Sequence, residues 1–322
     1  MRLSWSLSMF GLRRRKQTDG VGVDETKLGA GTADDNQLEL THVDRYEIIK
    51  PIGTGGMGTV YKAIDRERDR TVAIKVLDRR YDLDRKRRKR DHLGREILIA
   101  AQLKHDAIVR YHKEIIEVMD SAEHLRRCLI MEYVDGFDLR KHIKDRDLPL
   151  RDMIYVMERL CSGIDFLHQN GIVHRDIKPG NFMLTRDHQH VKIFDFGLSK
   201  SNASWRTRWM REGGGTRAYM PPEQLVNKRA KLDTRSDIFS FGITMYELFA
   251  GRHPCSGRDA KEIQRQIVSS KFRFESPSMF NPDIPPELDR ILLKSLRRQP
   301  KKRYQSVTEM LLDLSRMSGS RI

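Results

Sequence analysis

The chain has 322 residues, of which 38% are hydrophobic and 33% charged, enough apolar material for a sizeable core beneath a charged surface. Its formal net charge is +16, and its three cysteines are widely spaced with no Cys-x-x-Cys pair, so nothing indicates a disulfide framework or a zinc site. No run approaches the roughly 20 apolar residues that a membrane-spanning helix needs, so we expect a globular protein of one or two domains.

Residues 1–41 have the character of a flexible N-terminal arm. The apolar stretch at the start is broken by Ser4, Ser6 and Ser8, and its positive charges follow it, whereas those of a signal peptide precede it. Residues 17–41 are polar with little periodicity. We expect a cytoplasmic protein, and a weak membrane contact of the arm through Trp5 and the basic stretch at 13–16 stays open.

The next segment alternates short β-branched or aromatic runs with turn residues. This pattern predicts three antiparallel strands, at Tyr46–Lys50, Thr59–Ile64 and Thr71–Leu77. Apolar residues at helical spacing then predict a helix over Asp91–Leu103. A further strand is predicted over Cys128–Val134, and the polar pair Asp135-Gly136 after it is typical of a hinge.

Helical patterns dominate the rest of the chain. The spacing predicts helices over Met153–Gln169 and Ser236–Ala250, with Gly171 and Gly251 as C-terminal stops. The second of these is apolar enough to be a buried central helix. Later helices are predicted from Pro285-Pro286-Glu287 onward and over Ser306–Arg316. The sequence therefore indicates a small β-rich lobe followed by a larger helical lobe.

Two short runs contain much of the positive charge. Arg79–Arg90 holds eight basic and two acidic residues, and Lys294–Arg303 holds six basic and none acidic. Both are interpreted as solvated helix faces, with an acidic protein, an anionic lipid or a nucleic acid as the alternative partner.

A glycine-rich hairpin and a strand lysine form the first candidate phosphate site. Gly53-Thr54-Gly55-Gly56-Met57-Gly58 is a G-x-G-x-x-G run, which by itself is a weak signal. Here strand-like residues follow it directly, so the run predicts a hairpin whose bare backbone can lie close to phosphates. Lys75 follows in an apolar strand and requires an anionic partner there. We expect Glu96, on the predicted helix that comes next, to pair with Lys75.

The most specific stretch is His174-Arg175-Asp176-Ile177-Lys178-Pro179-Gly180-Asn181. Transfer of a phosphoryl group to an alcohol needs a carboxylate to orient the hydroxyl, a cation on the phosphate and oxygen ligands for Mg²⁺. Asp176, Lys178 and Asn181 offer these functions within six residues. Asp195-Phe196-Gly197 follows a strand-like run at 191–193, and its carboxylate suits a hard cation.

These motifs, in this order, resemble the eukaryotic-type (Hanks-type) serine/threonine protein kinase family over about residues 46–317. The runs at 55–61 and 219–224 are most similar to its bacterial branch. The resemblance implies an α+β, two-lobed protein kinase fold, with one helix in a small β-rich N-lobe and a larger, mainly helical C-lobe. We place the arm at 1–41, the kinase domain at 42–317 with lobes of about 42–134 and 135–317, and a tail at 318–322.

The resemblance also implies roles for single residues. Asp176 would be the catalytic base, Lys178 would contact the γ-phosphate, and Asn181 and Asp195 would ligate Mg²⁺, with Mn²⁺ as an alternative metal. ATP would meet Ile52, Gly53, Gly55, Gly58, Val60, Ala73, Lys75, Glu96, the gatekeeper Met131, Glu132, Val134, Asp138 beside the ribose, and Met183. Asp237 would brace the catalytic loop, which is the stretch from His174 to Asn181. Glu223 would pair with Arg303 as a structural contact.

The substrate class and its control follow from the same resemblance. Lys178 and Thr216 are typical of serine/threonine kinases, which implies protein substrates, including acidic ones. The chain's own activation loop, from Asp195 to Glu223, is a further expected substrate. Arg175 would clamp a phosphorylated loop, with Ser204 and Thr207 among the candidate sites. Alternatively Glu212 pairs with Arg175 and reduces the need for phosphorylation.

Three other classes of protein were weighed. A non-catalytic pseudokinase scaffold would usually lack one of Lys75, Asp176, Asn181 or Asp195, and all four are present. Nucleic-acid binding is not expected, because the basic runs contain few aromatic residues. A kinase acting on a small molecule is disfavoured by the segment 215–223, which in the family is shaped for a polypeptide acceptor.

Overall fold

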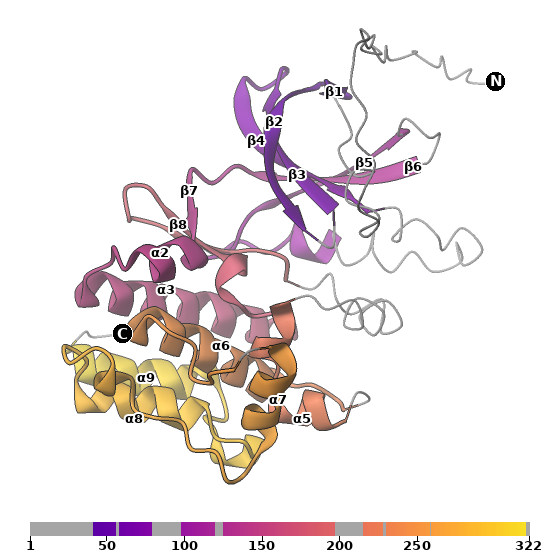
Figure 1. Cartoon of the computed structure of the whole chain (residues 1–322). Helices are drawn as coiled ribbons and strands as arrows, with labels where there is room; N and C mark the ends of the chain where they lie inside the picture. Colours follow the sequence, from indigo (N-terminus) through magenta and orange to yellow (C-terminus); the bar gives the residue numbers. More distant parts are fainter. Residues whose placement is uncertain are drawn as a thin grey trace, which may run out of the picture.

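The computed structural model describes residues 41–55, 58–78, 98–119, 125–196, 215–227, 230–257 and 259–319. Figure 1 shows a twisted sheet above a group of helices, with a short second sheet where the two parts meet. This architecture confirms the predicted two-lobed α+β fold.

The upper lobe is built on an antiparallel sheet with strand order β1-β2-β3-β4-β6-β5. Its strands are β1 (His42–Val43), β2 (Tyr46–Gly55), β3 (Gly58–Asp65), β4 (Arg70–Leu77), β5 (Tyr111–Met119) and β6 (Leu125–Glu132). Burial alternates along β3, as expected where one face of a strand is covered, whereas the last six residues of β4 are all buried. The three predicted strands are confirmed.

One strand prediction needs correction, and one strand was not predicted at all. The strand predicted over Cys128–Val134 starts earlier, at Leu125, and ends at Glu132. Its first residues were missed because Arg126 and Arg127 look like loop residues, yet Arg126 is buried and its Nε donates to the Leu77 carbonyl at 2.8 Å. β5 was not predicted, because charged residues interrupt its apolar pattern.

The lower lobe consists mainly of helices. They are α2 (Leu139–Asp145), α3 (Leu150–Gln169), α5 (Pro222–Val226), α6 (Thr234–Ala250), α7 (Ala260–Val268), α8 (Pro286–Ser295) and α9 (Val307–Ser318), with the short 3₁₀ helices η3 (Pro179–Asn181), η4 (Gly215–Tyr219), η5 (Pro277–Met279) and η6 (Pro300–Lys302). The four predicted C-lobe helices are confirmed as α3, α6, α8 and α9. The helices α2, α5 and α7 were not predicted. Of the helix predicted over Asp91–Leu103, residues 98–100 are helical, and 91–97 lie outside the described residues.

The central helix α6 is buried on opposite faces. Phe241, Met245 and Phe249 belong to the main core, whereas Phe239 and Tyr246 pack into a second cluster with α7. A helix that is covered all round needs no polar stripe, which is why its sequence is almost continuously apolar. It ends at Gly251 with φ 67°, the left-handed cap that glycine adopts without strain.

A second, three-stranded sheet lies where the lobes meet. Its strands β7 (Gly136–Asp138), β8 (Phe182–Thr185) and β9 (Val191–Ile193) pair in that order. The main core spans both lobes, since it contains Ala73 and Met131 from the upper sheet together with residues of α3, α6, α8 and α9. The interface between the lobes is thus a packed apolar region, to which β8 and β9 also contribute buried residues.

The second basic run is not a uniformly solvated face. Arg303 is 3% exposed, and Arg298 donates to the backbone carbonyls of Ile267 and Gln266. The interpretation as a solvated surface is wrong for these two arginines, because backbone carbonyls and a carboxylate compensate their charge inside the fold. The other run, Arg79–Arg90, lies outside the described residues. None of the helices described is long and apolar enough to cross a membrane.

Candidate active site

The predicted glycine hairpin is present between β2 and β3. Gly55 pairs with Gly58, and β3 continues as strand, as expected for a hairpin rather than a strand-to-helix loop. At Gly58, φ is 133°, and a Cβ atom would overlap the Val76 carbonyl, so only glycine lets the hairpin lie this close to β4. Residues 56 and 57 lie outside the described residues.

Lys75 lies on β4 and is 4% exposed. Its Nζ atom lies 2.6 Å from the Asp195 carboxylate, which comes from the segment after β9. The sequence predicted Glu96 as the partner of Lys75, and Glu96 lies outside the described residues. The anionic group that Lys75 requires is therefore supplied here by a residue 120 positions away.

Asp195 is held in an unusual backbone conformation and in an ionised state. Its φ is 56°, and the next residue, Phe196, is buried with its ring 5.6 Å from that of Tyr111. Burial acts to raise the pKa of Asp195, but the charges of Lys75 and Lys178 outweigh it and leave the pKa below its usual value. The carboxylate is thus anionic at neutral pH and suited to a cationic partner.

Asp176, Lys178 and Asn181 form one hydrogen-bonded cluster. Lys178 Nζ donates to Asp176 Oδ2 at 2.8 Å. The Asn181 amide nitrogen donates to both the backbone carbonyl of Asp176, at 2.6 Å, and its Oδ2, at 3.1 Å. Among the described residues, the amide oxygen of Asn181 makes no hydrogen bond. The cluster therefore combines a carboxylate that is only 11% exposed, a cation and an amide oxygen that can act as a metal ligand.

Backbone bonds join this cluster to Asp195. The Phe194 N–H donates to the Asn181 carbonyl at 2.9 Å. His174 Nε2 lies 3.0 Å from the Phe194 carbonyl. The five charged or polar groups predicted for catalysis and metal binding, Lys75, Asp176, Lys178, Asn181 and Asp195, thus meet at the junction of the lobes.

Asp237 binds the backbone of the catalytic loop and holds it in place, as the resemblance implied. Its carboxylate accepts from the backbone N–H groups of His174, at 2.7 Å, and Arg175, at 2.8 Å, and lies 2.9 Å from His168 Nε2. Asp237 is 1% exposed. Arg175 has φ 67°, a conformation that costs about 1–2 kcal/mol for a residue with a Cβ atom. The bond from Asp237 stabilises it there.

The residues predicted to hold adenine line the same junction. Ala73 on β4 pairs with the buried Met131 on β6, and Met183 on β8 pairs with Asp138 on β7. Val60 lies opposite Lys75 in the sheet. The Glu132 side chain bonds Lys192 Nζ at 2.7 Å. The strand registers thus bring together residues that are 15, 45 and 58 positions apart in the sequence.

Asp138 has a contact that the sequence analysis missed. Its carboxylate caps α2 by accepting from the Arg140 N–H at 2.9 Å, and it also binds the Arg140 guanidinium, with Nη2 at 2.5 Å. Spacing alone offered a signal, because an arginine two residues after an N-cap aspartate can fold back on it.

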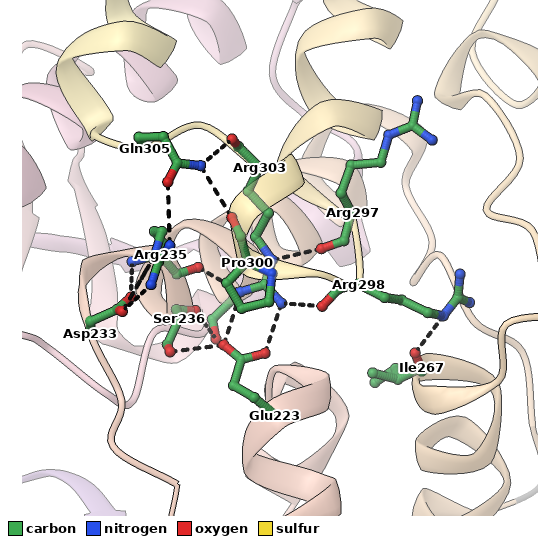
Figure 2. A network of polar contacts seen from close by, with 11 residues as sticks. Glu223, Asp233, Arg235, Ser236, Ile267, Arg297, Arg298, Pro300, Arg303 and Gln305 are labelled. Carbon is green, nitrogen blue, oxygen red and sulfur yellow. Dashed lines mark hydrogen bonds and ion pairs between the residues drawn. The ribbon is translucent and has the colours of Figure 1, made fainter.

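The Glu223–Arg303 pair is confirmed. Arg303 Nη1 and Nη2 donate to the two Glu223 oxygens at 2.9 and 2.7 Å. Figure 2 shows Arg303 at the centre of a network that also binds the carbonyls of Arg235, Arg297 and Arg298. This network ties α5 to the start of α6 and to the segment between α8 and α9.

Several predicted residues cannot be placed. Glu96, Gly197, Ser204, Thr207 and Glu212 lie outside the described residues, as does the side chain of Thr216. Arg175 Nε is buried without a hydrogen-bond partner among the described residues. The predicted phosphosites and the clamping of the loop by Arg175 therefore remain predictions.

Comparison with known proteins gives the class to which this fold and site belong. The family model described as the protein kinase domain matches residues 46–313, so the chain belongs to the protein kinase family. Probable serine/threonine-protein kinase SCO3848 of Streptomyces coelicolor is 38% identical over 84% of this chain and 39% of its own length. Serine/threonine-protein kinase PknB of Mycobacterium tuberculosis is 36% identical over 85% of this chain and 43% of its own length.

The chain thus spans about two fifths of the length of these curated relatives. Among solved structures, the Mycobacterium tuberculosis PknI kinase domain has a TM-score of 0.62 at 27% identity, and the match covers 85% of this chain and 97% of that one. Rad53 residues 1–466 in complex with AMP-PNP has a TM-score of 0.64 at 27% identity, covering 83% and 64%. The fold and the family are those expected from the sequence.

Proposed function

We propose that this chain is an active serine/threonine protein kinase, which transfers the γ-phosphate of ATP to hydroxyl groups of proteins. The observation that carries the proposal is the cluster of Asp176, Lys178 and Asn181 next to the Lys75–Asp195 pair. The names of the curated relatives support the activity, and the AMP-PNP complex of Rad53 supports ATP as the donor.

The geometry suits Asp176 as the residue that receives the acceptor hydroxyl. Its carboxylate is held by Lys178 and Asn181, which fixes the direction of its free lone pairs. Asp176 would orient the hydroxyl and accept its proton, while Lys178 would neutralise charge on the transferred phosphoryl group. Lys75 would bind phosphate oxygens beneath the glycine hairpin.

The donor set suits a hard divalent cation, and we propose Mg²⁺, with Mn²⁺ as the alternative. The Asn181 amide nitrogen faces Asp176, which leaves the amide oxygen for a cation, and Asp195 is anionic. Oxygen ligands of this kind are those that Mg²⁺ prefers. When bound, the metal would neutralise phosphate charge, and this chain would supply two of its ligands.

The serine/threonine class follows from Lys178, which lies 2.8 Å from Asp176 in the acceptor site. We further propose that the substrates include the chain's own activation loop, with Ser204 and Thr207 as candidate sites. The functional domain is taken as residues 42–317, preceded by the arm at 1–41.

The test is incubation of the purified chain with Mg-ATP, alone and with a generic protein substrate, followed by phosphosite mapping. Wild-type chain should incorporate phosphate on serine or threonine. Asp176→Asn should lower the rate by about 10²–10⁴-fold, the range typical of a lost general base. Absence of transfer by the wild-type chain, with or without added protein, would favour the pseudokinase scaffold.

A further inference from the structure

Arg140 lies beside the candidate active site, at the start of α2. α2 packs against η3, which contains Gly180 and Asn181. A Cβ atom added to Gly180 would lie 3.1 Å from Arg140 Nε and 3.3 Å from its Cζ. Because residue 180 has no side chain, the guanidinium can rest against the catalytic loop between Lys178 and Asn181.

One edge of this guanidinium is occupied and the other is free. Nε and Nη2 bind the Asp138 carboxylate, at 3.1 and 2.5 Å. Among the residues that the structure describes, Nη1 makes no hydrogen bond, and the Arg140 side chain is 71% exposed. Arginine has five N–H donors in a planar fork, so the Nη1/Nη2 edge can still take a second carboxylate. Asp138 holds the fork in place, which reduces the entropy lost when that second carboxylate binds.

The guanidinium lies between the catalytic loop and η4. On one side is the catalytic loop. Its residues Lys178 and Asn181 flank Pro179 and Gly180, and both bond Asp176. Tyr219 of η4 lies on the other, where its hydroxyl donates to Glu247 at 2.7 Å. Burial and Glu247 raise the pKa of Tyr219 and Arg140 acts to lower it, so the two side chains are close enough to interact electrostatically.

We propose that Arg140 selects substrates with an aspartate or glutamate close in sequence to the phosphorylated serine or threonine. The inference rests on the proposed function and names the substrate class for it. The acidic side chain would bind the Nη1/Nη2 edge while the acceptor hydroxyl lies at Asp176. Asp138 cannot select a basic residue there, because Arg140 already compensates its charge.

The experiment measures kcat and KM for a set of peptides at saturating Mg-ATP, and separately the KM for ATP. Each peptide has one threonine in an alanine-rich background, with a single aspartate moved from four residues before the threonine to four after it. For wild-type chain we expect one or two positions at which aspartate raises kcat/KM about fivefold to tenfold over alanine, mainly through KM for the peptide.

Three variants identify the source of that preference. Arg140→Ala should abolish it, Arg140→Lys should retain part of it through charge alone, and Arg140→Glu should shift it to lysine at the same position. The matched control is Lys141→Ala. Lys141 is the next cation on α2, and it bonds Asp145 at 2.6 Å and lies over Phe137, away from Gly180. This control should keep the wild-type preference and activity.

The same experiment distinguishes failure of the Arg140 inference from failure of the proposed kinase function. A wild-type chain that phosphorylates the peptides without preferring aspartate at any position overturns this inference alone. So does an Arg140→Ala variant that keeps the preference and changes only the KM for ATP, because Arg140 would then act on the nucleotide through Asp138. A wild-type chain that phosphorylates nothing overturns the proposed function and this inference with it.

Discussion

Two residues of the candidate active site adopt a left-handed backbone without being glycine. Arg175 has φ 67° and Asp195 has φ 56°. Such conformations persist where neighbouring contacts determine them, and they concentrate at functional sites. The Arg175 N–H is held by Asp237, and the Asp195 side chain by Lys75. In both places a charged side chain from a distant residue stabilises the left-handed conformation.

Replacing Asp237 by asparagine should lower kcat by about 10- to 100-fold with a smaller effect on the KM for ATP. Asparagine offers one oxygen where the His174 and Arg175 N–H groups use two, so the loop that presents Asp176 would shift. Steady-state kinetics with a peptide substrate measures the split between kcat and KM.

The matched control for that change is Asp233→Asn, at the N-cap of the same helix. Asp233 accepts from the Arg235 N–H and from its guanidinium, and it makes no contact with the catalytic loop. Asparagine is as good an N-cap as aspartate, so kcat should stay close to wild type. Equal losses of kcat in both variants would show that Asp237 acts only through the stability of α6.

At the scale of elements, one ion pair connects segments of the lower lobe that are distant in sequence. Glu223 lies in α5, and Arg303 follows η6, with 80 positions between them. The Arg303 side chain is fully buried and that of Glu223 is 20% exposed. Removing one partner of such a pair leaves the other charge buried and uncompensated, which typically costs several kcal/mol.

The Glu223→Gln variant should be less stable than wild type by about 3 kcal/mol at pH 7. Burial raises the pKa of Glu223, but the Arg303 bonds outweigh it and depress the pKa below its ordinary 4.5. A carboxylate with a depressed pKa stabilises the fold above its unfolded-state pKa, and this stability is lost as the pH falls through the folded value. The difference between the two proteins should therefore shrink below about pH 4.5.

Urea unfolding at a series of pH values measures that difference directly. Glu287→Gln is the control, because Glu287 forms an exposed pair with Arg290 within α8, and such pairs contribute little. Its free energy of unfolding should stay within about 0.5 kcal/mol of wild type. A Glu223→Gln deficit that is constant from pH 7 to pH 3 would contradict the assignment of the effect to the ionised pair.

At the scale of the whole molecule, the candidate site is assembled from both lobes. Lys75 belongs to the upper sheet, whereas Asp176, Asn181 and Asp195 belong to the segments below it. The apolar core is continuous across the same junction, from Ala73 and Met131 to α3 and α6. A nucleotide bound there would contact both lobes and so stabilise the folded chain as a unit.

AMP-PNP should therefore raise the Tm of the chain, and added Mg²⁺ should raise it further. At a ligand concentration 100 times Kd the stabilisation is about 2.7 kcal/mol. Asp195→Asn should keep a shift with nucleotide alone and lose the increment from Mg²⁺, because the proposed ligand set loses its anionic member. Thermal scans with AMP-PNP plus either MgCl₂ or EDTA measure this. Equal shifts in MgCl₂ and EDTA for wild-type chain would contradict a metal site at Asn181 and Asp195.

The sequence alone predicted the features that depend on contiguous residues. Strand and helix periodicity located the three early strands and four helices of the lower lobe, and the glycine run, the stretch from His174 to Asn181 and Asp195 identified the family. These signals are local, because side-chain alternation, turn chemistry and the geometry of a catalytic loop all act within a few residues. Elements such as β5 and α7 were missed where charged residues interrupt the apolar pattern.

Only the tertiary structure decided which distant groups meet. It placed Asp195 on Lys75, put two arginines of a basic run inside the fold, and set Arg140 against Gly180. Such contacts depend on strand register and on the packing of α2 and β9 at the lobe junction, which no short window of sequence contains. The kinase family could thus be inferred from the chain itself, whereas the proposed substrate selection by Arg140 became visible only in three dimensions.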